Sequence, residues 1–137
     1  MLEDNQYRYN TIKAMVLPLS LMGVIFILSS IHGQLNDGRL KFLTEIDPQL
    51  QNLLHIPLFG LLQVLWLRAF SKLGKSGWRI TVACLVVSVG YGCIDEFHQM
   101  FVPGRYASLM DIALNFTGVV LGTFLFFLWQ KNNFSNQ

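Results

Sequence analysis

Charged side chains are scarce in this chain. Among its 137 residues, 13% are charged and 53% are hydrophobic, whereas a soluble domain usually carries about 25% charged residues. The apolar residues also form long blocks, and the stretch 16–30 contains no charge at all. This composition excludes an ordinary soluble domain and indicates a single membrane domain, for which we expect no nucleic-acid partner.

Cysteine is almost as rare as charge. Cys84 and Cys93 lie on one predicted helix, and about 1.5 Å of rise per residue separates them by roughly 13 Å. They therefore cannot form a disulfide with each other, and their spacing matches no zinc or redox motif. The carboxylates and histidines could hold a divalent cation for metal-assisted chemistry, but their spacing is not diagnostic of a metal site. The sequence therefore assigns no metal and leaves any cofactor unidentified.

Four long apolar segments predict an all-α, polytopic membrane protein. The shortest has 18 residues, and at about 1.5 Å per residue it reaches roughly 27 Å, close to the thickness of a hydrocarbon core. We expect a loose tail at residues 1–13, the transmembrane domain at 14–129 and a polar tail at 130–137. Pro18 falls near the predicted start of the first helix, where proline is tolerated. The predicted spans are Ala14–Ile31, Leu53–Phe70, Ile80–Met100 and Leu109–Trp129.

Basic residues are distributed unequally between the two sides that this topology creates. Seven lie near the termini or the turn 71–79, against three in the loop 32–52 and the turn 101–108. Because cytoplasmic loops carry an excess of Lys and Arg, both termini and the turn 71–79 are expected in the cytoplasm. The loop 32–52 and the turn 101–108 are then extracytoplasmic. The seven basic residues are Arg8, Lys13, Arg68, Lys72, Lys75, Arg79 and Lys131.

Polar side chains collect at the extracytoplasmic ends of all four predicted spans. On the third span, the spacing from Tyr91 to Gln99 puts four of them on one helical face, whereas Glu96 lies about 100° further around. Ionisable groups at such positions are costly to retain unless they act or pair with one another. The group comprises Ser30, His55, Tyr91, Asp95, Glu96, His98, Gln99, Asp111 and Asn115.

The turn Pro103-Gly104-Arg105 leads into the fourth span. Arg105 is a planar, permanently charged donor that suits phosphate or carboxylate. The free N–H groups and the positive dipole end of the next helix also favour an anion. Ser108 is expected to cap that helix, with Asp111 completing a capping box. Further along, Gly118-x-x-x-Gly122 predicts the close approach of a neighbouring helix.

Two interpretations of this polar group remain open. It could be a structural clasp, in which Arg105 pairs with a nearby carboxylate and the other side chains satisfy backbone groups. For His55 or His98 alone, such a hydrogen-bonded structural role is the expected one. It could instead be a functional site, because a clasp rarely needs so many different chemistries at one depth.

The VanZ-like membrane protein family has a signature that this chain resembles over residues 14–125. The second half carries it in Tyr91-x-x-x-Asp95-Glu96-x-His98-Gln99-x-Phe101-x-Pro103-Gly104-Arg105, followed by Asp111-x-x-x-Asn115-x-x-Gly118. Ser29-Ser30 with Gln34, and His55, fit its earlier motifs. His32, Asn52 and Phe59 depart from it, since proline, lysine and tyrosine are common there. The resemblance implies a small, multi-pass protein of the bacterial cytoplasmic membrane, in a family whose namesake is associated with resistance to teicoplanin.

These observations lead to the hypothesis of a polar extracytoplasmic site that binds or processes a phosphate-bearing lipid or wall-precursor head group. Its expected partners are membrane lipids, a lipid-linked wall precursor or a lipoglycopeptide. The alternative is a non-catalytic envelope protein whose polar group is a clasp or a partner-binding surface. The candidate acid–base residues are Asp95, Glu96, His98 and His55, and the candidate ligand-binding residues are Arg105, Gly104, Gln99, Ser30, Asp111, Asn115 and Tyr91.

Overall fold

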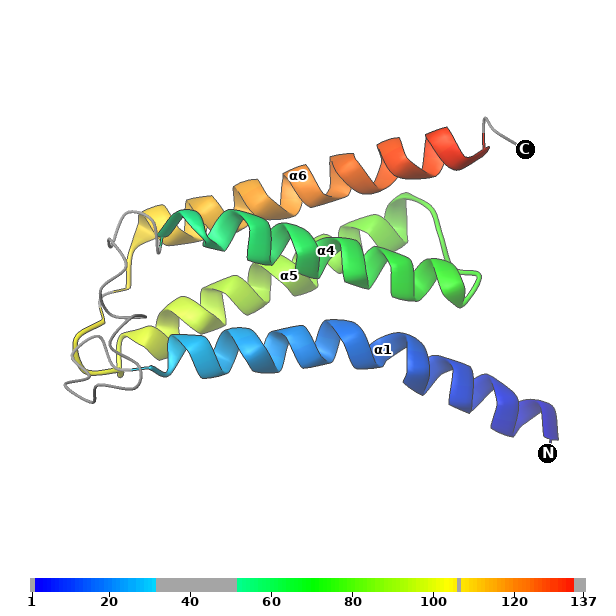
Figure 1. Cartoon of the computed structure of the whole chain (residues 1–137), viewed down its shortest axis with the longest axis horizontal. Helices are drawn as coiled ribbons and strands as arrows, with labels where there is room; N and C mark the ends of the chain where they lie inside the picture. Colours follow the sequence, from blue (N-terminus) through cyan, green and yellow to red (C-terminus); the bar gives the residue numbers. More distant parts are fainter. Residues whose placement is uncertain (1, 32–51, 106, 135–137) are drawn as a thin grey trace.

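A computed structural model describes residues 2–31, 52–105 and 107–134 of the chain. Within these ranges the chain forms helices and no strand, so the prediction of an all-α protein is confirmed. Nearly all of the expected loop 32–52 lies outside the described residues. The helices are α1 (Leu2–Ser29), α4 (His55–Lys72), α5 (Trp78–Gln99) and α6 (Leu109–Phe134) (Figure 1).

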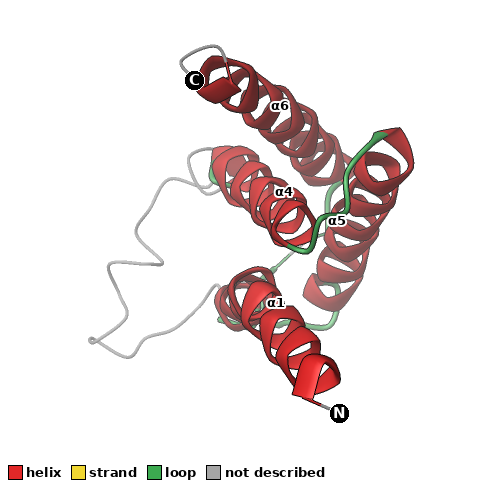
Figure 2. Ribbon diagram, turned by 90° about the vertical axis from the view of Figure 1, so that its right-hand side faces the viewer, coloured by secondary structure: helices red, strands yellow, loops and turns green. Residues whose placement is uncertain are grey.

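The four helices run up and down in one bundle. Both termini and the α4–α5 turn lie at one end of the bundle, and the α5–α6 turn lies at the other end (Figure 1). Helix α4 contacts the three other helices, and the end-on view shows it between α1 and α6 (Figure 2). This arrangement brings the end of α1, the start of α4, the end of α5 and the start of α6 together.

The helices extend further at both termini than the sequence predicted. Helix α1 begins at Leu2, so the segment expected to be a loose tail is helical, and α6 continues to Phe134 within the expected polar tail. Once an apolar span has nucleated a helix, each added residue costs little, and polar residues can propagate it. Local bonds reinforce the extension, since Gln6 Nε2 donates to Asn10 Oδ1 at 3.1 Å. Pro18 therefore lies well inside α1 rather than in its first turn, and α1 is visibly bent (Figure 1).

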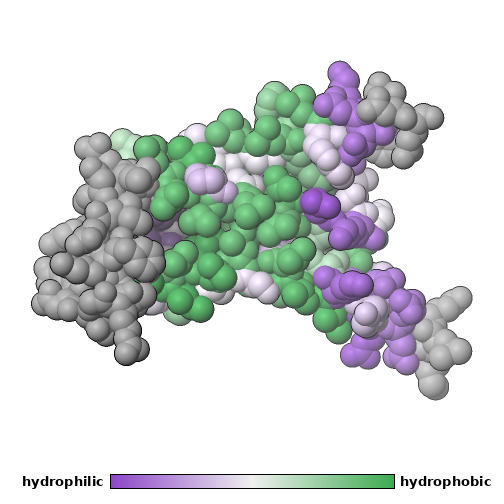
Figure 3. Space-filling view, viewed as in Figure 1, coloured by the Kyte–Doolittle hydropathy of each residue, from purple (hydrophilic) through white to green (hydrophobic). Residues whose placement is uncertain are grey.

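Among the described residues, three of the four helices are long and apolar enough to cross a membrane by length and composition. They lie in Asn5–Ser29, Trp78–Gln99 and Leu109–Asn133. The second predicted span, Leu53–Phe70, corresponds to α4, which is not among them. The 18 residues of α4 include the polar side chains of Gln63, Arg68 and Lys72. Its contacts with all three neighbours reduce the lipid-facing surface that would otherwise need apolar side chains. A broad hydrophobic surface covers the middle of the bundle, with hydrophilic residues at the end that holds the termini (Figure 3).

The closest helix contact joins α4 to α6 through glycine. A Cβ atom added at Gly118 would overlap the backbone of Ile56, and one added at Gly122 would overlap the backbone of Gly60. The prediction that Gly118-x-x-x-Gly122 permits a close helix approach is therefore confirmed. Because α4 and α6 touch backbone to backbone here, their side chains at the adjoining end of the bundle are brought within bonding distance.

A buried polar network crosses the bundle among α4, α5 and α6, and we call Gln63, Ser88 and Thr123 the middle network. Ser88 Oγ donates to Gln63 Oε1 at 2.8 Å, and Gln63 Nε2 donates to Thr123 Oγ1 at 3.0 Å. The Thr123 hydroxyl donates in turn to the carbonyl of Val119 at 2.9 Å. Both ends of the Gln63 amide therefore have a partner, although Gln63 and Ser88 are fully buried.

Candidate functional site

Polar side chains from all four helices meet at the end of the bundle opposite the termini. Five of them are buried, with exposed fractions of 1% for Asp95, 2% for Glu96, 4% for Gln99, 4% for Asp111 and 1% for Asn115. The structure thus brings together the residues that the sequence placed at one depth. We call this group the polar end, and it comprises Ser30, His55, Asp95, Glu96, His98, Gln99, Arg105, Ser108, Asp111 and Asn115.

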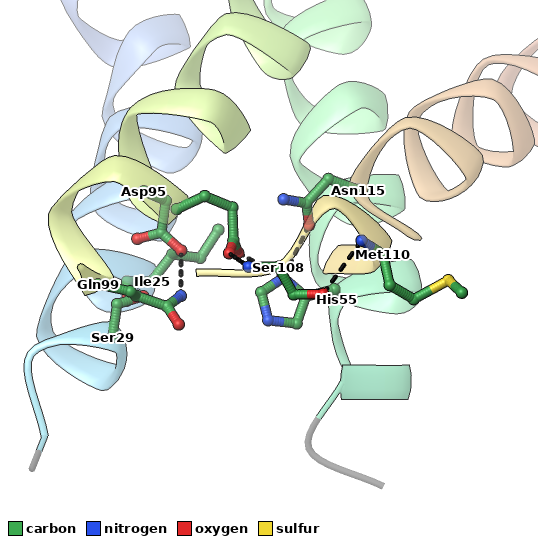
Figure 4. Close-up of polar contacts among 9 residues, drawn as sticks. Ile25, Ser29, His55, Asp95, Gln99, Ser108, Met110 and Asn115 are labelled. Atoms are coloured by element: carbon green, nitrogen blue, oxygen red, sulfur yellow. Dashed lines mark hydrogen bonds and ion pairs between the residues drawn. The ribbon is translucent and has the colours of Figure 1, made fainter. Parts of the chain in front are cut away.

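Glu96 reaches from α5 to the start of α6. Its Oε2 accepts the backbone N–H of Ser108 at 3.3 Å, while Ser108 Oγ accepts the N–H of Met110 at 3.1 Å (Figure 4). Ser108 is therefore the N-cap, as predicted, but the carboxylate that completes the box belongs to Glu96 rather than to Asp111. Sequence spacing suggests only partners in the same helix, so a carboxylate from a neighbouring helix was not expected. Two of the N–H groups at the start of α6, those of Ser108 and Met110, are thus already bonded to protein side chains.

His55 links the first turn of α4 to both α6 and α5. Its Nδ1 lies 2.8 Å from Asn115 Oδ1 (Figure 4) and 4.0 Å from Glu96 Oε1. An amide oxygen only accepts hydrogen bonds, so Nδ1 carries the proton in this contact. The Asn115 amide group is then oriented with its Nδ2 turned away from His55. His55 therefore positions both the Asn115 donor and a neighbouring carboxylate.

Asp95 and Glu96, which are adjacent in sequence, face different neighbours in the bundle. Asp95 lies with Gln99 beside Ile25 and Ser29 of α1 (Figure 4), and its Oδ2 accepts Gln99 Nε2 at 3.1 Å. The two adjacent carboxylates of α5 thus serve opposite sides of the polar end.

The α1 side of the polar end is fixed by contacts from α5. His98 Nε2 lies 3.0 Å from Ser30 Oγ, and its ring stacks on Phe26 with 4.5 Å between ring centroids. Two turns earlier on α5, the Tyr91 hydroxyl donates to the carbonyl of Met22 at 2.6 Å. Tyr91, a predicted ligand-binding residue, therefore has its hydroxyl directed to α1. Phe26 was not singled out from the sequence, although its spacing of four residues from Ser30 places both on one face.

The Pro103-Gly104-Arg105 turn is formed as predicted. Gly104 adopts a φ of 79°, which favours glycine, and the N–H of Arg105 donates to the carbonyl of Val102 at 3.1 Å. The half-buried Arg105 side chain donates from Nε to the carbonyl of Ile31 at 3.4 Å. It also lies within electrostatic range of Asp111. The turn therefore holds a guanidinium group between the end of α1 and the start of α6.

Four buried polar atoms of the polar end have no hydrogen-bond partner within residues 2–31, 52–105 and 107–134. They are three carboxylate oxygens and one amide nitrogen: Asp95 Oδ1, Glu96 Oε1, Asp111 Oδ1 and Asn115 Nδ2. Buried side-chain polar atoms are usually satisfied, because an unpaired one costs about 1–3 kcal/mol. In the described part of the chain, no three His, Cys, Asp or Glu side chains are arranged to hold a metal ion.

The fold and this site define a small helical membrane protein with carboxylates, histidines and an arginine gathered at one end of the bundle. The sequence model of the VanZ/LLP1 family matches residues 4–130, and the chain belongs to this family. The resemblance carried by the Tyr91–Arg105 and Asp111–Gly118 motifs is therefore confirmed. No curated protein and no solved structure gives a significant match to the chain.

Proposed function

We propose that this VanZ-like protein acts in the bacterial cell envelope by binding the head group of a phosphate-bearing lipid at the polar end. The observation that carries this proposal is the set of four buried polar atoms without a hydrogen-bond partner among the described residues, close to a half-buried arginine. A group that served the fold alone would be expected to satisfy these atoms internally. A ligand that enters from the adjacent membrane surface would supply the missing partners.

Phosphate is the head-group chemistry that Arg105 favours. A guanidinium group presents a rigid fork of donors that matches phosphate oxygens, and the bond from Nε to Ile31 orients that fork. Asn115 Nδ2 adds a neutral donor that has no acceptor in the described part of the chain, which suits a phosphate or ester oxygen. The lipid is either a phospholipid or an isoprenoid-linked wall precursor, since both carry phosphate at the membrane surface.

Binding is the role that we propose, and the histidines support it by position. Each has a ring nitrogen engaged with a side chain from another part of the bundle, His55 with Asn115 of α6 and His98 with Ser30, which directly follows α1. These contacts hold the walls of the site together. Acid–base chemistry by His55 and Glu96, whose Nδ1 and Oε1 are 4.0 Å apart, is the route by which the same site would process its ligand.

We place the polar end on the extracytoplasmic side of the membrane. The support for this is the excess of Lys and Arg at the opposite end of the bundle. On that side the site would meet the lipids and wall precursors among which glycopeptide antibiotics act. Sequestration or alteration of such a head group is our proposed link to the teicoplanin resistance associated with the family's namesake.

Native mass spectrometry of the full-length protein from mild detergent tests the proposal. We expect the wild type to retain a phosphate-bearing lipid and Arg105→Ala to lose it, with affinity reduced about tenfold or more. Arg79→Ala is the matched control, because it removes an exposed arginine from the opposite end of the bundle. The proposal is wrong if the wild type retains no lipid, or if all three proteins retain the same lipid equally.

A further inference from the structure

The polar end contains more acidic groups than a purely anionic ligand would tolerate. Glu96 lies within electrostatic range of Asp95, Asp111 and His55, and Asp111 lies within range of His55 and Arg105. Each of the three carboxyl groups also has one oxygen that is buried without a partner within the described residues. A phosphate alone would be attracted to Arg105 but repelled by these neighbouring carboxylates. A ligand that also brings positive charge would relieve this repulsion.

An ammonium group fits these acceptors better than a metal ion does. It is a compact cation with several N–H donors, and it needs nearby acceptor oxygens without a fixed coordination geometry. A metal ion needs several ligands converging at short distances. No such convergence occurs among the His, Cys, Asp and Glu side chains of residues 2–31, 52–105 and 107–134.

Resting on the proposed function, we propose that the ligand is a zwitterionic head group in which a primary ammonium lies next to the phosphate. The ammonium is recognised by Glu96 Oε1 and Asp111 Oδ1, and the phosphate by Arg105. Ser108, three residues after Arg105, donates its N–H to Glu96 Oε2 and accepts the N–H of Asp111 at its carbonyl. Arg105 and the two carboxylates therefore lie around the start of α6, and the proposal places the two charges of the ligand only a few bonds apart. Phosphoethanolamine has this spacing, whereas an amine on a wall-precursor peptide lies far from the pyrophosphate.

The number of N–H groups on the ammonium should affect binding, because Glu96 Oε1 and Asp111 Oδ1 have no hydrogen-bond donor among the described residues. A primary ammonium satisfies them by hydrogen bonds and also neutralises their charge. A quaternary ammonium, as in phosphatidylcholine, brings the same charge but no N–H donor. Phosphatidylglycerol brings the phosphate without any cation. A comparison of these three head groups therefore distinguishes the contributions of the phosphate, the positive charge and the N–H donors to binding.

Competition between these phospholipids for the full-length protein in nanodiscs tests the inference. For the wild type we expect phosphatidylethanolamine to bind about tenfold more tightly than phosphatidylglycerol or phosphatidylcholine. In Glu96→Gln and Asp111→Asn we expect this preference to shrink to about twofold or less. The binding of phosphatidylglycerol should be unchanged or tighter, because a negative charge has been removed while Arg105 remains.

Two controls keep the result interpretable. The amide oxygen that Glu96→Gln introduces can still accept the N–H of Ser108, so this variant preserves the cap of α6. Gln63→Leu alters a buried polar group of the middle network without touching the polar end, and it should retain the wild-type lipid preference. A thermal unfolding measurement in detergent on each variant verifies that the bundle is folded.

The outcomes separate this inference from the proposed function. Equal binding of the three lipids by the wild type, or an unchanged preference in both acidic variants, overturns the ammonium assignment and leaves a phosphate site. Equal binding of phosphatidylcholine and phosphatidylethanolamine overturns the assignment to a primary amine. Failure of the wild type to bind any of the three lipids overturns both proposals.

Discussion

The middle network and the polar end are two buried polar regions of one bundle, and they differ in how completely they are satisfied. In the middle network the amide of Gln63 both accepts and donates, with partners on α5 and α6. At the polar end, four buried atoms on three acidic residues and Asn115 have no hydrogen-bond partner within the described residues. The comparison distinguishes polar groups that complete the fold from polar groups that are available to something else.

Part of the polar end still acts as a clasp. Glu96 bonds to the start of α6, His55 bonds to Asn115, and His98 bonds to Ser30, so each contact joins two helices. The structural interpretation therefore accounts for the atoms of these side chains that form the contacts between helices. It does not account for Glu96 Oε1 or Asn115 Nδ2, which belong to the same side chains but lack hydrogen-bond partners in the described part of the chain. A clasp and a binding site share these residues.

The largest effect is expected from Gly118→Ala, which acts on the contact that holds both regions together. The added methyl group would overlap the backbone of Ile56, and overpacking of this kind costs about 1–3 kcal/mol. We expect a lower free energy of unfolding in detergent and, because α4 and α6 also carry His55 and Asn115, weaker lipid binding. Gly90→Ala is the control, since a methyl group there meets no atom within 4 Å and should not destabilise. Equal stability of the two variants would contradict the close contact.

Gln63→Leu tests the middle network and should separate stability from binding. Loss of two interhelical hydrogen bonds in a membrane costs about 1 kcal/mol, so the free energy of unfolding should fall by that amount. Head-group binding should remain at the wild-type level because no atom of the polar end is altered. Thr117→Val is the matched control, since the exposed Thr117 hydroxyl bonds only to a carbonyl of its own helix. A loss of lipid binding in Gln63→Leu would show that the two regions are coupled.

A smaller effect is expected at Ser108, where the polar end supports a helix terminus. Ser108→Ala removes the side-chain acceptor for Met110 and should cost about 0.5–1 kcal/mol, whereas Ser108→Gly should cost only a few tenths. Both variants keep the backbone N–H that donates to Glu96. Chemical unfolding of the three proteins under one condition gives the comparison. A loss well above 1 kcal/mol in Ser108→Gly would mean that the side chain does more than cap α6.

The fold was largely predictable from the sequence because lipid exposure imposes long apolar runs. Three spans, the Pro-Gly turn and the glycine contact followed from hydropathy, backbone conformation and spacing. The helical ends of α1 and α6 were not predicted, since polar residues such as Gln6 and Asn10 resemble a tail until an adjoining helix extends through them. The enclosed helix α4 was also predicted as a span, although it is not among the helices that are long and apolar enough to cross a membrane.

At the site, the members of the polar end were predictable but their pairings were not. Helical spacing placed Asp95, Glu96 and Asn115 at one end, because position along a span follows directly from residue number. The cap formed by Glu96 on α6 and the bond between His55 and Asn115 depend on how helices rotate against each other. No pattern within one helix records that rotation. The partnerless atoms, which carry the proposal, are likewise visible only after the helices are packed.

Asp111→Asn should have the smallest effect on stability and is the sharpest test of the comparison. Asp111 is buried, has one carboxylate oxygen without a partner among the described residues, and lies near the like charge of Glu96. Replacement by an amide removes the cost of burying a carboxylate and the repulsion from Glu96, but it also removes the attraction to His55 and Arg105. Because these effects oppose one another, the free energy of unfolding should be nearly unchanged. Binding of phosphatidylethanolamine should nevertheless fall about tenfold.

Chemical unfolding and lipid titration of the same preparation give both quantities. If Asp111→Asn instead destabilised the bundle as much as Gln63→Leu while lipid binding stayed constant, the polar end would be a clasp of the same kind as the middle network.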